Sequence, residues 1–270
     1  MNDTSGTFYY LSRAEIQPAY YLFDADSEEV NRLPEMQAIE MPVHDCRDTR
    51  DHFQIDKQGF AFVDFAPDFD RFHDRDAVRE IYYPMVEAVL LAATGALSVK
   101  VFDHNVRLNL EAKGSASDRP VRFVHNDYTE LSAPQRVKDI MGEAQGAELL
   151  KNRFAVINLW RPISGPVEDM PLGILDASSL AVEDFVSTDL VYRDRVGKIA
   201  SVRPNQNHQW YYLSGMRTNE ALLLKCFDSD TSGHARYTAH SAFKDAKAPE
   251  NPMPRESIEA RVLIFYAPGI

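Results

Sequence analysis

The pattern of apolar and polar positions divides the chain into one helical stretch followed by a long series of strands. Between Asp74 and Thr94, apolar side chains recur at three- and four-residue intervals, at Val78, Ile81, Tyr82, Met85 and Val89. Acidic residues at the start of this stretch and Gly95 just after its end are typical of helix boundaries, and Pro84 is expected to kink the helix. This spacing predicts the clearest helix of the protein.

After Gly95 the pattern changes to short runs rich in β-branched and aromatic residues. Eight such runs predict strands, at 98–110, 121–127, 154–163, 197–204, 208–214, 221–229, 235–243 and 256–268. Two interruptions, 131–151 and 177–194, look like helical insertions. The pattern therefore predicts a closed or double-sheet β architecture with the helix packed outside it.

The chain is expected to form one domain. No repeat or low-complexity segment occurs, and the 15 prolines and 12 glycines are spread thinly, so no linker is indicated. We expect a helical or mixed N-terminal lobe over 1–97 and a β core over 98–270 with the two insertions.

Composition and charge exclude several classes of protein. With 44% apolar and 26% charged residues, the chain resembles an ordinary globular protein. The net charge of −12 disfavours nucleic-acid and membrane-surface partners, and an anionic ligand would need local Arg or Lys. Because only Cys46 and Cys226 occur, and no leader-like or membrane-spanning apolar run is present, a reduced cytoplasmic protein is expected.

Familiar catalytic signatures are missing, which leaves metal ligation as the main candidate chemistry. The sequence contains no GxxxxGKS/T, GxGxxG, GxSxG, HExxH or CxxC motif. Among the eight histidines, only His125 is followed two residues later by a carboxylate, Asp127. On a strand, positions i and i+2 point to the same face, so this pair could bind one metal. Such a pair arises readily by chance, and a third ligand is needed.

The C-terminal part of the chain offers that third ligand and an anion site. His240 lies in the predicted strand 235–243, and on the last strand Arg255, Ser257, Glu259 and Arg261 share one parity. An Arg and a Ser at i and i+2 can bind one carboxylate together. The alternative is an edge strand with a solvated charged face.

His208 is the rival for the third ligand. It begins the aromatic run 208–214 and could reach the mouth of the barrel. We favour the interpretation of His208 as a structural histidine near the turn after Pro204. Cys46 and Cys226 are interpreted as small buried apolar residues.

The chain resembles a known enzyme family in its motifs. Four motifs, in their order along the chain, resemble those of the iron(II)/2-oxoglutarate-dependent oxygenases. They are HND (125–127), NLWRP (158–162), ARYTAH (235–240) and PRES (254–257). Five further segments resemble a narrower group, the bacterial and fungal hydroxylase/desaturase family, which includes the cephamycin 7α-hydroxylase component and a fungal gibberellin desaturase. These segments are DCR (45–47), QGFAFV (58–63), TGALSVKVFDHNVR (94–107), HQWYY (208–212) and CFDS (226–229).

The resemblance implies a fold and a metal site. The fold would be mainly β, a double-stranded β-helix (jelly roll) with an N-terminal α/β lobe and peripheral helices. His125, Asp127 and His240 match the iron triad of the family. Three protein ligands on one face leave three adjacent positions, two for 2-oxoglutarate and one for dioxygen.

The resemblance also implies co-substrate residues. Arg255 and Ser257 match the pair that binds the distal carboxylate of 2-oxoglutarate. Because the segment KDAKAPENPM lengthens the gap before Arg255, Arg261 is the alternative cation. Arg107 and Asn109 match positions that contact the co-substrate in related enzymes.

The implied function is iron(II)/2-oxoglutarate-dependent hydroxylation, desaturation or oxidative cyclisation of a small-molecule secondary metabolite. One alternative is a non-catalytic β-barrel protein that binds an acidic small molecule, although such a protein would be expected to lose a ligand of the triad. Another is an iron oxidase that works without 2-oxoglutarate and does not need the Arg–Ser pair. The sequence does not indicate an oligomeric state.

Overall fold

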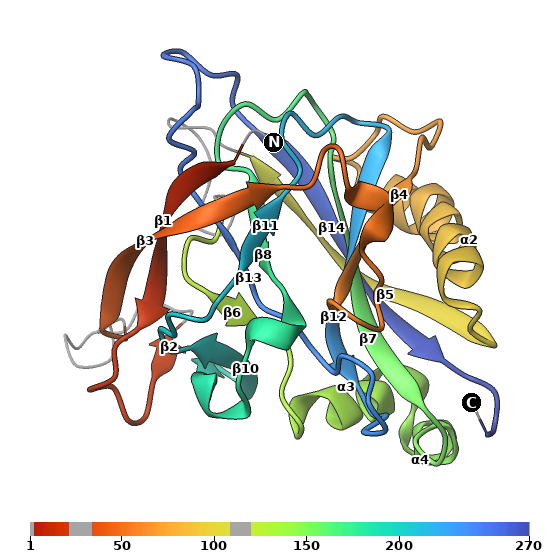
Figure 1. Ribbon diagram of the computed structural model, residues 1–270. Helices are drawn as coiled ribbons and strands as arrows, with labels where there is room; N and C mark the ends of the chain where they lie inside the picture. Colours follow the sequence, from red (N-terminus) through yellow and green to blue (C-terminus); the bar gives the residue numbers. More distant parts are fainter. Residues whose placement is uncertain (1–2, 22–33, 109–119, 270) are drawn as a thin grey trace.

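Two facing β-sheets make up most of the protein in a computed structural model, which describes residues 3–21, 34–108 and 120–269 (Figure 1). The larger sheet has nine strands in the order β1 (Thr4–Leu11), β3 (Met36–Asp45), β11 (Trp210–Tyr212), β8 (Leu172–Leu175), β13 (His240–Ala242), β6 (His125–Asn126), β10 (Val196–Val202), β9 (Phe185–Val191) and β2 (Ala19–Tyr21). The smaller has five, in the order β4 (Phe60–Asp64), β12 (Glu220–Asp228), β7 (Phe154–Pro162), β14 (Glu256–Phe265) and β5 (Ser98–Leu108). The prediction of a mainly β jelly roll is confirmed.

The predicted helix lies on the outer face of the five-stranded sheet (Figure 1). It comprises α1 (Arg75–Ala77), a π-helical turn (Val78–Tyr82) and α2 (Tyr83–Thr94). The Asp74 carboxylate accepts hydrogen bonds from the first turn, and Gly95 ends α2 in the left-handed conformation. The π-helical turn lies just before Pro84, which has no N–H to donate to the preceding turn, and the kink expected at Pro84 stays a prediction.

The five-stranded sheet is buried on both faces. On β7, Ile157 and Leu159 pack outward against the helix, while Val156 and Trp160 point into the core between the sheets. Because both faces are covered, every residue of β7 and β12 is buried. The inner core between the sheets is where the polar residues of interest meet.

Strand β14 lies inside the sheet, between β7 and β5. Its residues Ile258 and Ala260 pack toward the helix, whereas Ser257 and Glu259 are buried on the opposite, inward face. The alternative of an edge strand with a solvated charged face is therefore wrong, because neighbouring strands cover both edges. The polar side chains of β14 face the interior of the protein.

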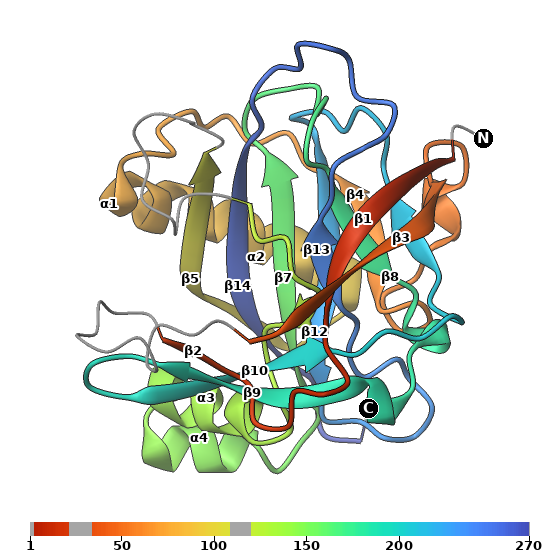
Figure 2. The ribbon, with the colours of Figure 1, turned by 90° about the vertical axis from the view of Figure 1, so that its left-hand side faces the viewer.

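One of the two predicted helical insertions is confirmed. Segment 131–151 forms α3 (Ser132–Met141) and α4 (Glu143–Leu149), which lie at the end of the molecule near β10 (Figure 2). Segment 177–194 instead forms two short 3₁₀ turns (Ala177–Ser179 and Val182–Asp184) and strand β9. Its β-branched residues pair along β10, and Thr188 and Ser201 share a 2.7 Å hydroxyl hydrogen bond across this hairpin.

The segment 1–97 contributes β1, β2 and β3 to the larger sheet and β4 to the smaller one, together with a further 3₁₀ turn (Arg50–His52).

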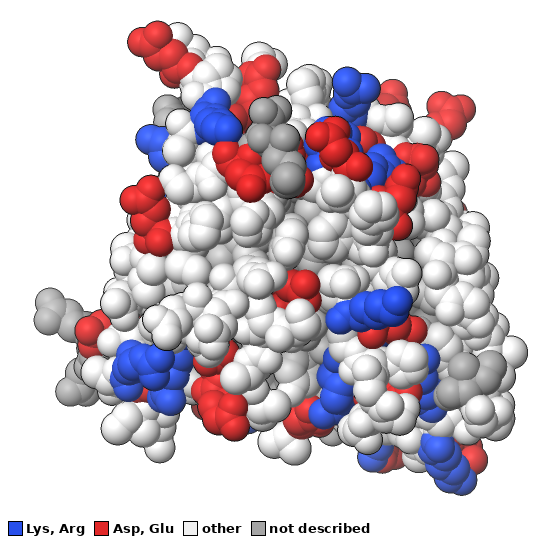
Figure 3. Space-filling model, viewed as in Figure 1, with Lys and Arg blue, Asp and Glu red and all other residues white. Residues whose placement is uncertain are grey.

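Among the described residues, no helix is long and apolar enough to cross a membrane. On the face shown in Figure 3, most acidic and basic side chains gather toward the upper and lower margins, and charged groups are few in the broad band between them. On this face the acidic charge is thus mixed with basic groups.

Candidate metal centre

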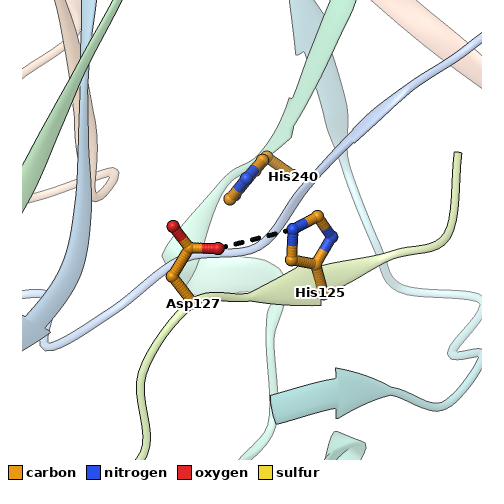
Figure 4. Close-up of side chains that lie close together, drawn as sticks. All are labelled: His125, Asp127 and His240. Atoms are coloured by element: carbon orange, nitrogen blue, oxygen red, sulfur yellow. Dashed lines mark ion pairs between the residues drawn. The ribbon is translucent and has the colours of Figure 1, made fainter. Parts of the chain in front are cut away.

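Three side chains from the larger sheet meet at one point between the two sheets. His125 on β6 pairs directly with His240 on β13, and Asp127 follows β6 at once. The centres of the two imidazole rings lie 4.4 Å apart, and Nε2 of His125 lies 3.5 Å from Oδ1 of Asp127 (Figure 4). One ligand atom of each residue lies within 4.8 Å of the others. The predicted convergence of these three residues is confirmed.

The protonation states of the three side chains suit a metal ion. Nδ1 of His125 donates to the carbonyl of Phe123 at 2.9 Å, so Nε2 is the nitrogen that faces Asp127. Burial, together with the neighbouring His125, lowers the pKa of His240 to about 3, so its imidazole is neutral at pH 7. Burial acts to raise the pKa of Asp127, but Arg261 and the histidines outweigh it and hold that pKa well below its ordinary value. The set is two imidazoles, of which His240 is neutral, and one carboxylate.

Two side chains from the smaller sheet bind the second oxygen of Asp127. Oδ2 accepts hydrogen bonds from Nδ2 of Asn158 at 2.8 Å and from Nε of Arg261 at 3.0 Å. Nη1 of Arg261 also donates to Asp103 at 3.0 Å. The guanidinium of Arg261 is therefore engaged by two carboxylates beside the metal centre.

A second buried cation lies near the start of β14. Arg255 is 4% exposed, donates to the carbonyl of Met170 and lies over the ring of Trp160, with 5.3 Å between its Cζ and the ring centre. Among the described residues, its Nε and the buried Oγ of Ser257 have no hydrogen-bond partner. Burial, together with Arg107, lowers the pKa of Arg255 to about 9.

The remaining predicted residues fall in different places. Arg107 on β5 lies directly opposite Ser257 in the register of β5 and β14. Asn109 lies outside the described residues. His208 does not join the metal centre, because Nδ1 lies 3.0 Å from the Tyr10 hydroxyl and Nε2 lies 3.1 Å from Asp184. The interpretation of His208 as a structural histidine is confirmed.

Sequence analysis missed Asn158 and the role of Asn126. Asn158 is one of two polar residues, with Arg161, in the otherwise apolar run FAVINLWRP, and this was the available signal. Asn126 lies between two ligands, and its Nδ2 donates to the carbonyls of Tyr128 and Cys226, each at 2.9 Å. These two bonds tie the ligand-bearing turn to β12. Cys46 and Cys226 are free and buried, as predicted.

The residues present fit iron and an anionic co-substrate. Two imidazoles with one carboxylate match the donor set of non-haem iron(II) sites that use 2-oxoglutarate. Nδ1 of His240 is buried and has no partner among the described residues, and the same holds for Nε of Arg255 and Oγ of Ser257. Buried polar atoms of this kind normally have partners, so ligands are expected to supply them.

Comparison with known proteins agrees with this geometry. The family described as "Oxidoreductase/YMDC permease-like domain" matches residues 8–265. The chain is 34% identical over 232 residues to the Fe(II)/2-oxoglutarate-dependent dioxygenase nvfI of Aspergillus novofumigatus, covering 82% of this chain and 81% of that protein. It is 33% identical over 248 residues to the hydroxylase/desaturase efuI of Hormonema carpetanum, covering 83% and 82%.

A solved structure has the same fold. A variant of the iron and alpha-ketoglutarate-dependent endoperoxidase NvfI superposes with a TM-score of 0.89 at 28% identity, covering 97% of this chain and 96% of that one. Together with the convergence of His125, Asp127 and His240, these matches identify the chain. It belongs to the Fe(II)/2-oxoglutarate-dependent dioxygenases of the fungal hydroxylase/desaturase family.

Proposed function

We propose that this dioxygenase binds Fe(II) through His125, Asp127 and His240 and holds the distal carboxylate of 2-oxoglutarate with Arg255 and Ser257. Its substrate would be a small-molecule secondary metabolite that undergoes hydroxylation, desaturation or oxidative ring formation. When bound, iron and 2-oxoglutarate supply oxidising power toward C–H bonds, consuming dioxygen and releasing succinate and carbon dioxide. The relatives support this range, since they are named hydroxylase/desaturase and endoperoxidase.

The observation that carries the co-substrate assignment is the buried Arg255 with its neighbour Ser257. A guanidinium that is 4% exposed, and whose Nε has no hydrogen-bond partner among the described residues, is costly to bury unless an anion joins it. Ser257 adds a hydroxyl whose oxygen has no partner among the described residues. Arginine can bind a carboxylate through two parallel N–H bonds, which fixes both the position and the orientation of the anion.

Arg107 and Arg261 take different parts in this proposal. Arg107 lies across from Ser257 and adds positive charge near Arg255, which helps a dianion to enter a protein of net charge −12. Arg261 is the less suitable cation for the distal carboxylate, because Asp127 and Asp103 already occupy its guanidinium. Contact between Asn109 and the co-substrate stays a prediction, as does a cytoplasmic location.

The protein contributes positioning to this chemistry. His125 and His240 present ring nitrogens from two paired strands, and Asp127 presents one oxygen from the turn after β6. The Trp160 ring and the carbonyl of Met170 hold the Arg255 side chain in place. The site therefore has a metal-binding end on the larger sheet and a carboxylate-binding end on the smaller sheet.

The test is anaerobic titration of the protein with Fe(II) and 2-oxoglutarate, followed by succinate release in a screen of metabolite extracts. We expect a charge-transfer absorption band in the titration and 2-oxoglutarate-dependent succinate in the screen. Absence of the band would contradict the proposal and favour a binding protein. A product formed without 2-oxoglutarate would favour an iron oxidase.

The Arg255→Lys variant tests the carboxylate-binding end. Lysine keeps the charge but loses the planar pair of donors, so the KM for 2-oxoglutarate should rise about tenfold or more while Fe(II) affinity is kept. The matched control is Arg153→Lys, since Arg153 also lies over an aromatic ring, 4.2 Å from the centre of Tyr266, but at the opposite end of β7. An unchanged KM in Arg255→Lys would move the role to another cation.

A further inference from the structure

The two carboxylate oxygens of Asp127 have different surroundings. Oδ1 faces Nε2 of His125 at 3.5 Å, on the side where the three ligands meet (Figure 4). Oδ2 points to the smaller sheet, where it accepts one hydrogen bond from Asn158 at 2.8 Å and one from Arg261 at 3.0 Å. Two N–H donors use the two lone pairs of that oxygen.

The two donors are themselves held in fixed positions. Asn158 on β7 and Arg261 on β14 are directly paired in register, and both reach inward from the smaller sheet. Nδ2 of Asn158 also donates to Glu259 at 2.6 Å, so both hydrogens of the amide are used. Asp103 accepts from the far end of Arg261 at 3.0 Å. Neither donor can rotate away from Asp127 without breaking a second bond.

We propose that Asn158 and Arg261 are positioning residues that occupy Oδ2 of Asp127 and so reserve Oδ1 alone for the metal. A carboxylate that binds through one oxygen takes one coordination position, whereas binding through both oxygens would take two. Since 2-oxoglutarate and dioxygen together need three open positions, a second bound oxygen from Asp127 would block one of them. The proposal rests on the metal assignment made above.

The competing explanation is purely structural, in which the two bonds only join the sheets. Asn158 is fully buried, and Arg261 carries the positive charge next to Asp127 and Asp103, so their loss would lower stability under either explanation. Stability alone therefore cannot decide between the two. A measurement of the metal's surroundings can.

The experiment titrates the metal-free protein with Co(II) alone and records its d–d absorption spectrum, which depends on the number and arrangement of ligands. Asn158→Ala and Arg261→Met should each weaken Co(II) binding by about 10- to 100-fold and change the spectrum. The KM for 2-oxoglutarate, measured at saturating Fe(II), should rise as well, because a second Asp127 oxygen on the metal would take a position that the co-substrate needs. Arg261→Lys, which keeps a cation that can reach Oδ2, should recover part of the affinity.

The control is Arg153→Met, which removes a buried guanidinium from two other carboxylates, Asp228 on β12 and Asp56 in the segment before β4. Arg153 binds Asp228 at 2.7 Å and Asp56 at 3.0 Å, about 17 Å along β7 from Asn158. This variant should lose stability while keeping the Co(II) affinity and spectrum. If Arg261→Met does not fold, Asn158→Ala decides the question, because it removes no charge.

The outcomes separate this inference from the proposed function. If the wild-type protein binds no Co(II), or binds it equally well after Asp127→Ala, the metal assignment itself fails. If the wild-type protein binds Co(II) at Asp127, but Asn158→Ala and Arg261→Met show the wild-type affinity and spectrum, only the positioning role is overturned.

Discussion

At the scale of single residues, the contacts of two histidines distinguish a ligand from a structural group. Both nitrogens of His208 have partners, Tyr10 and Asp184, whereas Nδ1 of His240 is buried without one among the described residues. We expect His240→Ala and Asp127→Ala to abolish Fe(II) binding, because each removes a direct ligand. His208→Ala should keep the absorption band of Fe(II) with 2-oxoglutarate. If the band were lost in His208→Ala and kept in His240→Ala, His208 would be the metal ligand and His240 the structural histidine.

His208 should also contribute to the pH dependence of stability. Burial lowers its pKa below the unfolded value of about 6.5, and the bond to Asp184 offsets this only in part. As the pH falls below about 6.5, the unfolded chain takes up a proton that folded His208 does not, so the free energy of unfolding decreases. Above that pH the full contribution is present.

The measurement is urea unfolding of the metal-free protein at pH 7, 6 and 5. His208→Gln keeps a polar side chain but cannot titrate, so its stability should fall less steeply than that of the wild type, by up to about 1.4 kcal/mol per pH unit. His240 has a lowered pKa in both proteins and cancels in the comparison. Equal slopes would show that His208 does not titrate differently in the folded protein.

At the scale of elements, the sequence predicted those that carry a strong apolar pattern. Strands β7, β12 and β14 and the helix of 74–94 were located because burial on both sides demands long apolar runs or helical periodicity. Strand β9 was missed because its identity comes from pairing with β10, not from its own weak alternation. The bond from Asn158 to Asp127 could not be predicted, because it joins residues of different sheets, 31 positions apart.

The turn that follows β6 depends on Asn126, which links the two sheets through backbone carbonyls. Its amide donates to Tyr128 and to Cys226 on β12, each at 2.9 Å. Asn126→Ala should leave these two buried carbonyls without that donor and lower the free energy of unfolding by about 1–3 kcal/mol. Because His125 and Asp127 flank this residue, Co(II) affinity should fall as well. A variant that lost stability but bound Co(II) normally would show that the turn keeps its shape without Asn126.

At the scale of the whole molecule, the proposed ligands would join the two sheets. The histidines belong to β6 and β13 of the larger sheet, whereas Arg255 and Ser257 belong to the β14 region of the smaller one. A metal bound to the first group and a dicarboxylate that reaches from the metal to the second would hold both sheets in the folded state only. Ligands that bind only the folded protein stabilise it by mass action.

Thermal unfolding under anaerobic conditions should therefore show two successive increases in Tm, one when Co(II) is added and a second when 2-oxoglutarate follows. Co(II) at 100 times its Kd should add about 2.7 kcal/mol of stability, which corresponds to a rise in Tm of about 5–11 °C for a domain of this size. Adding 2-oxoglutarate should raise the Tm again. Arg255→Met should keep the first increment and lose most of the second, because only the distal carboxylate loses its partner.

Asp127→Ala should lose both increments, because 2-oxoglutarate binds through the metal at one end and through Arg255 at the other. These increments distinguish the loss of a ligand contact from a general loss of stability, because a structural weakening would lower the Tm of each variant without changing the rise caused by either ligand. If 2-oxoglutarate stabilised Asp127→Ala as much as it stabilises the wild type with Co(II), the co-substrate would bind independently of the metal. The two ends of the site would then belong to separate ligands, and the link between the sheets would be lost.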